Sequence, residues 1–271
     1  MAIVAVIKSF GLSERRCCRL VDQNPSTQRY KGKTSASDGL VRERMRELAN
    51  RYRRFGSPRL HTLLKKEGLV QNHKRTERLY RLEGLTLRRK RPKRKSNTIR
   101  VAMAPATRSN QCWSMDFVFD ALLKGRRIKC LTIVDDFSKI CPRIEVSHSI
   151  SGLHLVRILE EIRGIAELPK TIRVDNGPEF QSKALWEFCF TNGIELHHIQ
   201  PGKPTQNPYV ESFNGKFRDE CLNEQCFLNL EDAKIKVEDW REFYNSFRPH
   251  SSLGGLSPNE FAIGKELGLT A

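Results

Sequence analysis

Two aspartates of this chain stand where carboxylates could hold divalent cations. Asp116 lies in Trp113-Ser-Met-Asp-Phe-Val-Phe-Asp120, where apolar and polar residues alternate as in a half-buried strand. Asp175 ends the β-rich run Thr171-Ile-Arg-Val and is followed by the turn signal Asn-Gly-Pro. Asp175 should therefore lie at the carboxyl edge of a strand, where α/β sheets expose their chemistry.

A third acid, Glu211, falls in the first turn of a helix that Asn207 caps and Pro208 begins. It lies 36 positions after Asp175, which itself lies 59 positions after Asp116. Hard cations prefer oxygen ligands, and two ions about 4 Å apart can activate the attacking oxygen and stabilise the leaving oxygen of an in-line displacement. We expect Asp116 to bridge two ions, with Asp175 on one and Glu211 on the other.

Other polar pairs have simpler interpretations. Asp135 and Asp136 precede a Phe-Ser-Lys turn and are interpreted as turn residues. His197 and His198 are adjacent in a predicted strand, so their side chains face opposite sides and could not share one ion. A single Asp at a strand end is also more often a turn residue, so the prediction depends on all three acids together.

A sheet with helices must position these acids. The pattern predicts three strands joined by short turns, then strands that alternate with helices, which is the order of a ribonuclease H-like α/β core with a mixed five-stranded sheet. The predicted strands cover 113–120, 128–135, 140–146, 171–175 and 195–199, and the helices cover 151–166, 183–192, the segment from 208 and 230–243. We expect the core at residues 111–225 and a helical tail at 226–271, where the role of Arg248-Pro-His250, structural or nucleic-acid contact, stays open.

Charge is distributed unevenly along the 271 residues. Residues 1–99 hold 27 Lys and Arg against 8 Asp and Glu, whereas residues 100–220 hold 16 against 15 and residues 221–271 hold 5 against 8. The excess of basic over acidic residues that gives the chain its net charge of +17 therefore lies in the first third of the sequence. This asymmetry indicates a polyanion-binding amino-terminal region joined to a nearly neutral domain.

The basic region should be all helical. Residues 1–36 form a short helical segment in which Ser13 and Asn24 begin helices, and residues 31–38 are a polar linker. Residues 37–87 form a helix-turn-helix domain in which Ser57-Pro opens one helix with Leu60, Leu63 and Leu64 inward, Gly68 ends it and Asn72 caps the next. Residues 88–110 form a basic linker whose like charges repel. The predicted DNA contacts of the second helix and the linker are Lys74, Arg75, Arg78, Arg81, Arg88, Arg89, Lys90, Arg91, Lys93, Arg94 and Lys95.

The sequence resembles the transposases of bacterial insertion sequences, within the DDE superfamily shared with retroviral integrases. It is most similar to the second-reading-frame product of the insertion sequence three family. The segments that carry the likeness are Trp113 to Asp116, Val174-Asp-Asn-Gly-Pro-Glu-Phe180, Tyr209-Val-Glu-Ser-Phe-Asn-Gly-Lys-Phe-Arg-Asp-Glu-Cys-Leu-Asn223 and Tyr244-Asn-Ser-Phe-Arg-Pro-His250. It covers about residues 54–262, with Pro208 where the family usually has a small residue.

This resemblance implies a DDE polynucleotidyl transferase that binds insertion-sequence ends and cleaves and joins DNA with two Mg²⁺ ions, which Mn²⁺ could replace. It further implies a homo-multimer on terminal inverted repeats and target DNA, and fusion to or partnership with an upstream-frame product. Arg218, seven positions after Glu211, matches a basic family residue that holds the phosphate next to the scissile bond. The alternatives are a catalytically silent, domesticated DNA-binding regulator and a ribonuclease H-like nuclease.

The remaining sequence features indicate a cytoplasmic bacterial protein associated with the nucleoid and with no membrane partner. Residues 1–7 are apolar but too few for a signal peptide, and no run of 18 apolar residues occurs. The eight cysteines have no metal-ligand spacing and should be free, mostly buried thiols.

The charge division predicts that residues 1–99 carry most of the DNA affinity, with a steep dependence on salt. Each neutralised phosphate contributes a slope of about −0.9 in log affinity against log salt concentration. A fragment that begins near Ile99 should therefore bind element ends weakly. Equal affinity of that fragment and the full chain at about 0.15 M salt would contradict this division.

Overall fold

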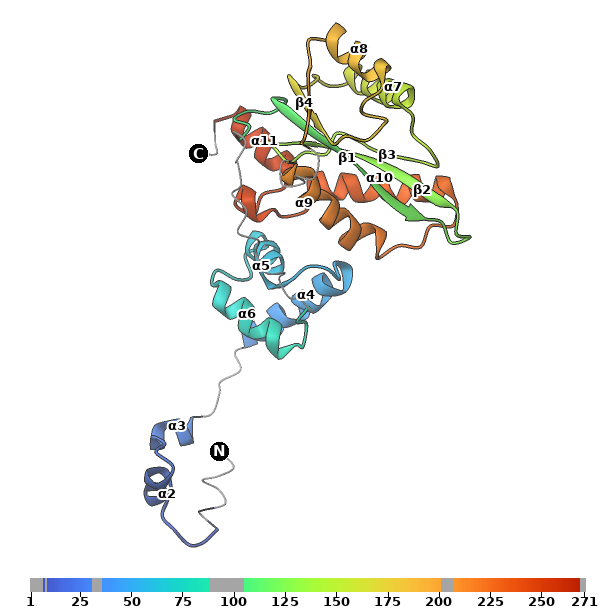
Figure 1. The fold of residues 1–271 in the computed structure, drawn as a ribbon. Helices are drawn as coiled ribbons and strands as arrows, with labels where there is room; N and C mark the ends of the chain where they lie inside the picture. The colour runs from blue at the N-terminus through green and yellow to red at the C-terminus, as the bar shows by residue number, and fades with distance from the viewer. Residues whose placement is uncertain (1–6, 8, 31–35, 88–104, 201–206, 269–271) are drawn as a thin grey trace.

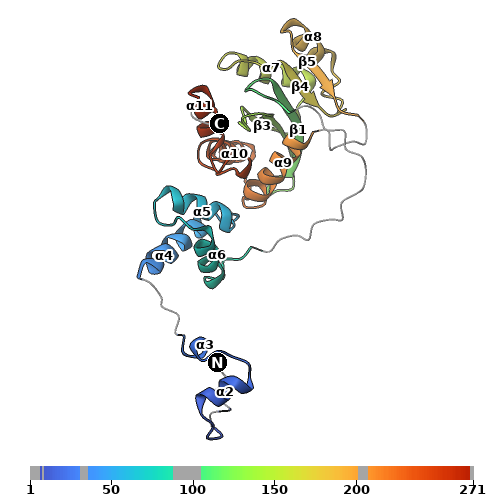
Figure 2. The same ribbon diagram turned by 90° about the vertical axis from the view of Figure 1, so that its left-hand side faces the viewer.

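The computed structural model describes residues 7, 9–30, 36–87, 105–200 and 207–268. Its described part contains a helical amino-terminal region followed by a sheet covered by helices on both faces, as Figures 1 and 2 show. The helices of the first region are α2 (Glu14–Leu20), α3 (Pro25–Arg29), α4 (Ala36–Arg51), α5 (Ser57–Lys66) and α6 (His73–Leu82).

Short polar side chains start these helices as the sequence predicts. Ser13, Asn24 and Asn72 accept a backbone N–H at the beginnings of α2, α3 and α6, so each satisfies a donor that has no partner inside its helix. Gly68 follows α5 with a φ of +74°, where a side chain would be strained. The expected polar linker ends earlier than predicted, because α4 already begins at Ala36.

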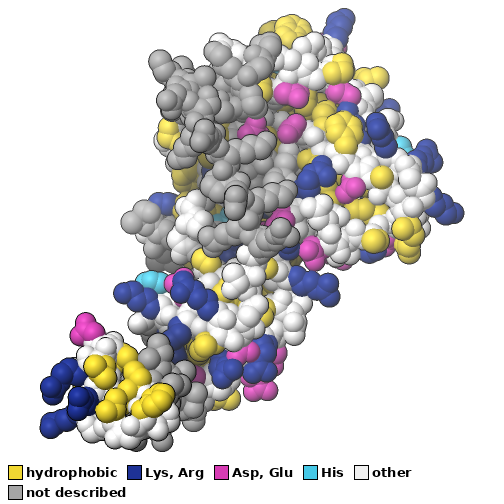
Figure 3. All heavy atoms as spheres, turned by 60° about the horizontal axis from the view of Figure 1, so that its bottom comes forward, with side chains coloured by type: hydrophobic (Ala, Val, Ile, Leu, Met, Phe, Trp, Pro, Cys, Tyr) yellow, Lys and Arg dark blue, Asp and Glu magenta, His cyan; other side chains and the backbone are white. Residues whose placement is uncertain are grey.

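Helices α4, α5 and α6 enclose a small core of their own. Leu60, Leu63 and Leu64 are buried on one face of α5, against Met45 of α4 and Leu79 of α6. The predicted inward positions of Leu60, Leu63 and Leu64 are confirmed, because all three side chains are buried. In Figure 3, Lys and Arg side chains stand out on the helical region in the lower half of the view.

The sheet has the predicted mixed topology. Its order is β3-β2-β1-β4-β5, in which β1, β2 and β3 are antiparallel and β1, β4 and β5 are parallel. Its strands are β1 (Cys112–Ala121), β2 (Arg127–Asp135), β3 (Ile144–Ser147), β4 (Thr171–Val174) and β5 (Glu195–His198). The ribonuclease H-like fold class is confirmed.

Alternation along the strands divides the core into two layers. Trp113 and Met115 of β1 face a cluster with α7 (Gly152–Arg163) and α8 (Lys183–Thr191). Val118, on the other face, packs against α9 (Pro208–Phe217) and α10 (Leu230–Ser246). Asp116 lies two residues before Val118 on β1, so its side chain points to the same face of the sheet, towards α9. The remaining elements are the π-helical turn η2 (Arg218–Leu222), the 3₁₀ turn η3 (Ser251–Leu253) and α11 (Pro258–Glu266).

The third strand is shorter than predicted. Residues 140–143 are not in the sheet, and β3 begins only at Ile144. The carbonyls of Ile140 and Arg143 still accept from the N–H groups of Asp135 and Ile133 on β2. Between them, the Asn245 side chain of α10 accepts from the Cys141 N–H at 2.9 Å and donates to the Cys141 carbonyl at 2.9 Å. Lys139, with a φ of +65°, turns the chain just before.

The predicted state of the cysteines is confirmed: all eight are free thiols and only Cys226 is exposed. Among the described helices, none combines the length and the apolar character that a bilayer crossing requires.

Gly152 permits the close approach of α7 to the loop that follows β4. A Cβ atom at this position would lie 2.1 Å from Ser182 Oγ and 3.3 Å from the Glu179 carbonyl oxygen. Gly152→Ala should therefore destabilise the fold by about 1–3 kcal/mol, as overpacking does. Thermal unfolding measures this, with Gly39→Ala in α4 as the control.

The control has the opposite expected sign. Gly39 lies inside a helix with open space around the position of a Cβ atom. Alanine there should stabilise by about 0.5–1 kcal/mol. Equal effects of the two substitutions would show that the contact of Gly152 with Ser182 does not restrict the fold.

Candidate active site

The register of β1 and β4 brings two of the three predicted acids together. Ser114 pairs with Arg173 in parallel register, so two residues further along each strand Asp116 lies beside Asp175 on the same face. Neighbouring strands are about 4.8 Å apart. Asp175 comes directly after the last residue of β4, as predicted.

Asn214 fixes the Asp116 carboxylate, and sequence reasoning gave it no role. Its Nδ2 donates to Asp116 Oδ2 at 2.8 Å, while its Oδ1 accepts from Thr132 Oγ1 at 2.8 Å. The other carboxylate oxygen of Asp116 accepts from the Phe117 N–H at 2.8 Å. Asn214 lies three residues after Glu211 on α9, so this contact docks the helix that carries the third acid against β1.

The carboxylates of the site influence one another electrostatically. Burial raises the pKa of Asp116, and the negative charge of Asp175 raises it further, against the hydrogen bonds from Phe117 and Asn214. Desolvation also raises the pKa of Glu211, with a further contribution from the charge of Asp116. The Glu211 side chain is largely exposed, so only part of its hydration is lost. Asp116 thus interacts electrostatically with both Asp175 and Glu211.

The loop after β4 is held on several sides. Asp175 Oδ1 accepts from the Gly177 N–H at 2.9 Å, which closes a turn. Phe180 stacks on Phe117 of β1 with ring centroids 4.8 Å apart. Glu179 forms an ion pair with Lys129 of β2, whose Nζ also lies 3.7 Å from the centre of the Phe117 ring.

Asp135 and Asp136 are structural, as interpreted from the sequence. Asp135 accepts from the backbone N–H groups of Asn110, Phe137 and Ser138, and so shapes the turn. Asp136 is buried and accepts from Ser114 Oγ at 2.6 Å and from Arg173 at 2.7 Å. Burial raises its pKa, against the hydrogen bond from Ser114 and the charge of Arg173.

The donor set of the site suits a hard cation. Within the described residues, no three His, Cys, Asp or Glu side chains are already assembled as a metal cluster. The oxygens of Asp116 instead accept hydrogen bonds from Asn214 and Phe117. Asn207 adds an unsatisfied oxygen, because its Oδ1 is buried without a described donor while its Nδ2 donates to the Met115 carbonyl at 3.3 Å. A carboxylate whose pKa is raised by the charge of a neighbouring acid and an orphaned amide oxygen are groups that a hydrated divalent ion would satisfy.

The predicted cap of α9 is partly wrong. Asn207 is the N-cap residue and Pro208 begins the helix, but the Asn207 side chain makes no capping hydrogen bond. It turns instead towards β1, beside Asp116.

Arg218 lies beside β1 but beyond the regular helix. Helix α9 ends at Phe217, and Arg218 starts the π-helical turn η2. Its guanidinium donates to the Phe119 carbonyl at 3.0 Å, three residues along β1 from Asp116. The neighbouring acids that could have paired with it, Asp219 and Glu220, bind other arginines. A role for Arg218 at the scissile phosphate remains a prediction.

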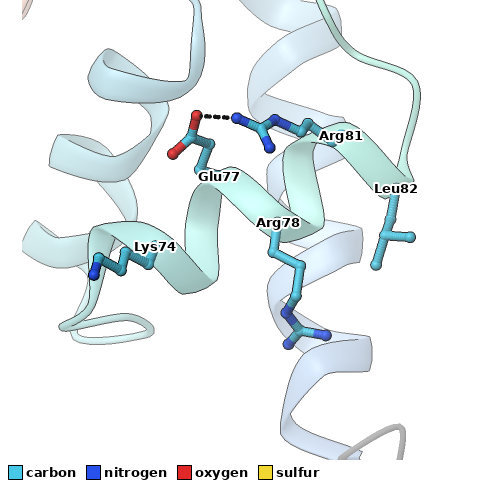
Figure 4. A pocket seen from close by; sticks show the side chains of 5 residues that line it. All are labelled: Lys74, Glu77, Arg78, Arg81 and Leu82. Atoms are coloured by element: carbon cyan, nitrogen blue, oxygen red, sulfur yellow. Dashed lines mark hydrogen bonds and ion pairs between the residues drawn. The ribbon is translucent and has the colours of Figure 1, made fainter. Parts of the chain in front are cut away.

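The four predicted DNA contacts on α6 lie on one helix, and three of them already have acidic partners. Figure 4 shows Lys74, Arg78 and Arg81 along this helix, with Arg81 paired to Glu77. Arg75 and Arg78 both pair with Asp38 of α4, at 2.7 and 2.8 Å. Arg81 pairs with Glu77 at 2.6 Å, while Lys74 has no ion pair among the described residues. A hollow of about 440 Å³ lies beside this helix and is lined by Lys74, Glu77, Arg78, Arg81 and Leu82. The basic run from Arg88 to Lys95 lies outside the described residues.

Comparisons with known proteins agree with this architecture. The integrase core domain family matches residues 106–204 and again 192–258, and an HTH-like domain matches residues 36–93. The 31.7 kDa protein of insertion element IS407 from Burkholderia multivorans is 48% identical over 258 residues, which cover 95% of this chain and 93% of that protein. The chain belongs to the insertion-sequence transposases of the insertion sequence three family.

A more distant relative and a solved structure also match this transposase. A transposase assigned to insertion sequence element IS150 of Escherichia coli (strain K12) is 27% identical over 238 residues, which cover 82% of each protein. A structure of the simian T-cell lymphotropic virus intasome matches with a TM-score of 0.51 and 15% identity over 80% of this chain and 74% of that chain. The latter similarity shows the fold alone.

Asp116→Asn should stabilise the metal-free transposase. A carboxyl whose pKa is raised by folding costs stability as the pH rises from its unfolded pKa to its folded pKa, and the cost is fully present above the folded pKa. The amide removes that charge. In EDTA at pH 7 the melting temperature should rise, by about 2–4 °C for each kcal/mol gained.

Metal addition should reverse the order. Mg²⁺ should raise the melting temperature of the wild type, which binds it in the folded state, and leave Asp116→Asn unchanged. Asp120→Asn, a change on the same strand outside the site, should respond as the wild type does. A Mg²⁺ shift of equal size in Asp116→Asn would contradict a metal site at Asp116.

Proposed function

We propose that this transposase cleaves and joins DNA at the ends of its insertion sequence, with Asp116, Asp175 and Glu211 as its catalytic acids. The observation that carries this proposal is the parallel pairing of β1 and β4, which aligns Asp116 with Asp175 under the helix that bears Glu211. The membership of the family supports a polynucleotidyl transferase.

The acids would hold two Mg²⁺ ions, which Mn²⁺ could replace. Bound ions supply Lewis-acid activation of the attacking oxygen and stabilise the leaving oxygen. The protein's part is positional: β1 and β4 fix the two aspartates, and Asn214 keeps α9 and its Glu211 close to them. The attacking oxygen belongs to water in end cleavage and to a DNA 3′-hydroxyl in strand transfer.

DNA contacts surround this centre in the proposal. Arg218, held at the Phe119 carbonyl, would bind the phosphate next to the scissile bond. The exposed arginines of α6, Arg78 and Arg81, would bind the terminal inverted repeat together with Lys74. Because Arg has five donors, a partner carboxylate leaves some free for phosphate.

The proposed assembly is a homo-multimer on paired element ends and target DNA. The chain would work in the cytoplasm at the nucleoid, fused to or accompanied by the product of an upstream reading frame. The basic excess of the first third supports the DNA-bound state.

Asp175→Asn should abolish both end cleavage and strand transfer while DNA binding changes by no more than a few-fold. The amide cannot supply the negative charge that holds an ion, and the predicted DNA-binding helices are separate from β4. The measurement is Mg²⁺-dependent cleavage and joining of labelled element ends, beside a gel-shift titration.

Glu187→Gln on α8 is the control, since it also replaces one carboxylate by an amide, on an exposed side chain outside the site. It should cleave and join as the wild type does. Strand transfer by Asp175→Asn would refute the assignment of Asp175. Cleavage without joining by the wild type would instead identify a nuclease, and specific binding without either reaction would identify a silent regulator.

A further inference from the structure

The motif Arg248-Pro-His250 is buried and binds a single carboxylate. The Arg248 side chain is only 2% exposed. It donates two hydrogen bonds to the Glu220 carboxylate, from Nε to Oε2 at 2.6 Å and from Nη2 to Oε1 at 2.7 Å. Nη1 of Arg248 lies 3.3 Å from His250 Nε2. Burial and then the charge of Arg248 lower the pKa of His250 to about 2, so this ring is a neutral acceptor. The motif therefore fixes the position of Glu220.

Glu220 also receives an arginine from the HTH-like domain. Nη1 of Arg59, on α5, donates to Glu220 Oε1 at 2.8 Å, and the Glu220 side chain is only 6% exposed. One carboxylate is thus shared by an arginine of each domain. Burial and the nearby charge of Arg248 lower the pKa of Lys216 to about 8, which shows that a third cation lies close to this pair. Without Glu220, like charges would face each other across the interface.

The surrounding interface is extensive. Figures 1 and 2 both show α5 next to the carboxyl-terminal elements of the core. Tyr52, at the end of α4, stacks on Phe243 of α10 with centroids 5.2 Å apart. Two more ion pairs cross it: Arg54–Asp219 and Lys66–Glu260.

The shared carboxylate is joined directly to the catalytic helix. Glu220 lies in η2, which continues α9 without a break, and Glu211 lies in the first turn of α9. A π-helical turn widens the helix locally and is frequent at functional sites. Because packed helices move as rigid elements, the position of Arg59 is connected to that of Glu211 through one continuous helical segment.

We propose that Arg59 and Glu220 are positioning residues that hold the HTH-like domain in a fixed orientation to the catalytic helix, so that DNA bound by the first domain presents one phosphodiester bond to the acids. The part concerning DNA rests on the proposed function. Arg248 keeps the Glu220 carboxylate in place for this contact.

An ion pair is suited to this role because its geometry is directional. The aromatic contact between Tyr52 and Phe243 supplies non-directional adhesion. A buried pair contributes little net stability relative to apolar residues, yet it becomes costly when one partner is lost. Loss of Arg59 leaves the Arg248–Glu220 pair intact, so it should alter orientation more than folding.

Arg59→Ala tests this with DNA substrates that carry the cleavage point at a known bond. Wild type should cut one phosphodiester bond, whereas the variant should distribute its cuts over neighbouring bonds. At saturating DNA its rate at the wild-type bond should fall about ten- to a hundredfold, the scale on which small misplacements act. Binding affinity in a gel shift should stay within a few-fold.

Two variants separate positioning from other effects. Arg59→Lys keeps a cation and should restore part of the accuracy of cutting. Arg143→Ala removes an arginine ion pair of comparable exposure just before β3, away from the interface, and should cut as the wild type does. A single wild-type cut at the wild-type rate by Arg59→Ala would overturn the proposal, as would equally scattered cuts by Arg143→Ala.

Small-angle X-ray scattering tests the domain contact without DNA. The double variant Arg54→Ala/Arg59→Ala should have a larger radius of gyration than the wild type, with unchanged circular dichroism. An unchanged radius would show that these arginines do not hold the domains together and would overturn the proposal. If the wild type cuts no DNA, the proposed function fails by itself, and the scattering result still decides the docking.

Discussion

The repulsion between neighbouring carboxylates is the constraint on which the rest of this structure depends. Parallel pairing of β1 with β4 places Asp116 beside Asp175, and burial together with that charge raises the pKa of Asp116. The acids themselves favour a more open arrangement. Two apolar layers hold them in place, because the strands that carry them are packed on one face against α7 and α8 and on the other against α9 and α10. Stability lost at a functional site is commonly supplied by such a core.

A buried cation on β4 does not neutralise the site. Arg173 lies two residues before Asp175 on β4, yet its guanidinium pairs with Asp136 at 2.7 Å. Asn214, which contacts Asp116 directly, carries no charge. Among the described residues, neither of these contacts balances the negative charge of Asp116. That arrangement suits a centre that takes up divalent ions, because an internal cation would compete with them.

Much of the fold could be predicted from local patterns. Period-two alternation located β1, and Ser13, Asn24 and Asn72 marked helix starts, since both signals act between residues close in sequence. The turn and helix signals around the three acids were enough to propose a site, and the assignment of its residues remains a proposal. Residues 140–143 were assigned to a strand wrongly, because the partner that binds them, Asn245, is distant in sequence. Asn214 and Glu220 escaped notice for the same reason: their partners lie on β1, α5 and the carboxyl-terminal tail.

Long-range ion pairs also change how the basic residues of the first third should be understood. Charge counting treats each arginine as available to DNA, but Asp38 holds both Arg75 and Arg78, and these two pairs lower the pKa of Asp38. An arginine held by one carboxylate has its planar group oriented and still has unused donors. Pairing therefore reduces the net field that attracts DNA while it fixes the direction from which a phosphate can be bound. In the proposed DNA-bound state, the arginines of this domain would serve orientation as much as attraction, and the ion pair of Arg59 with Glu220 is directional in the same way.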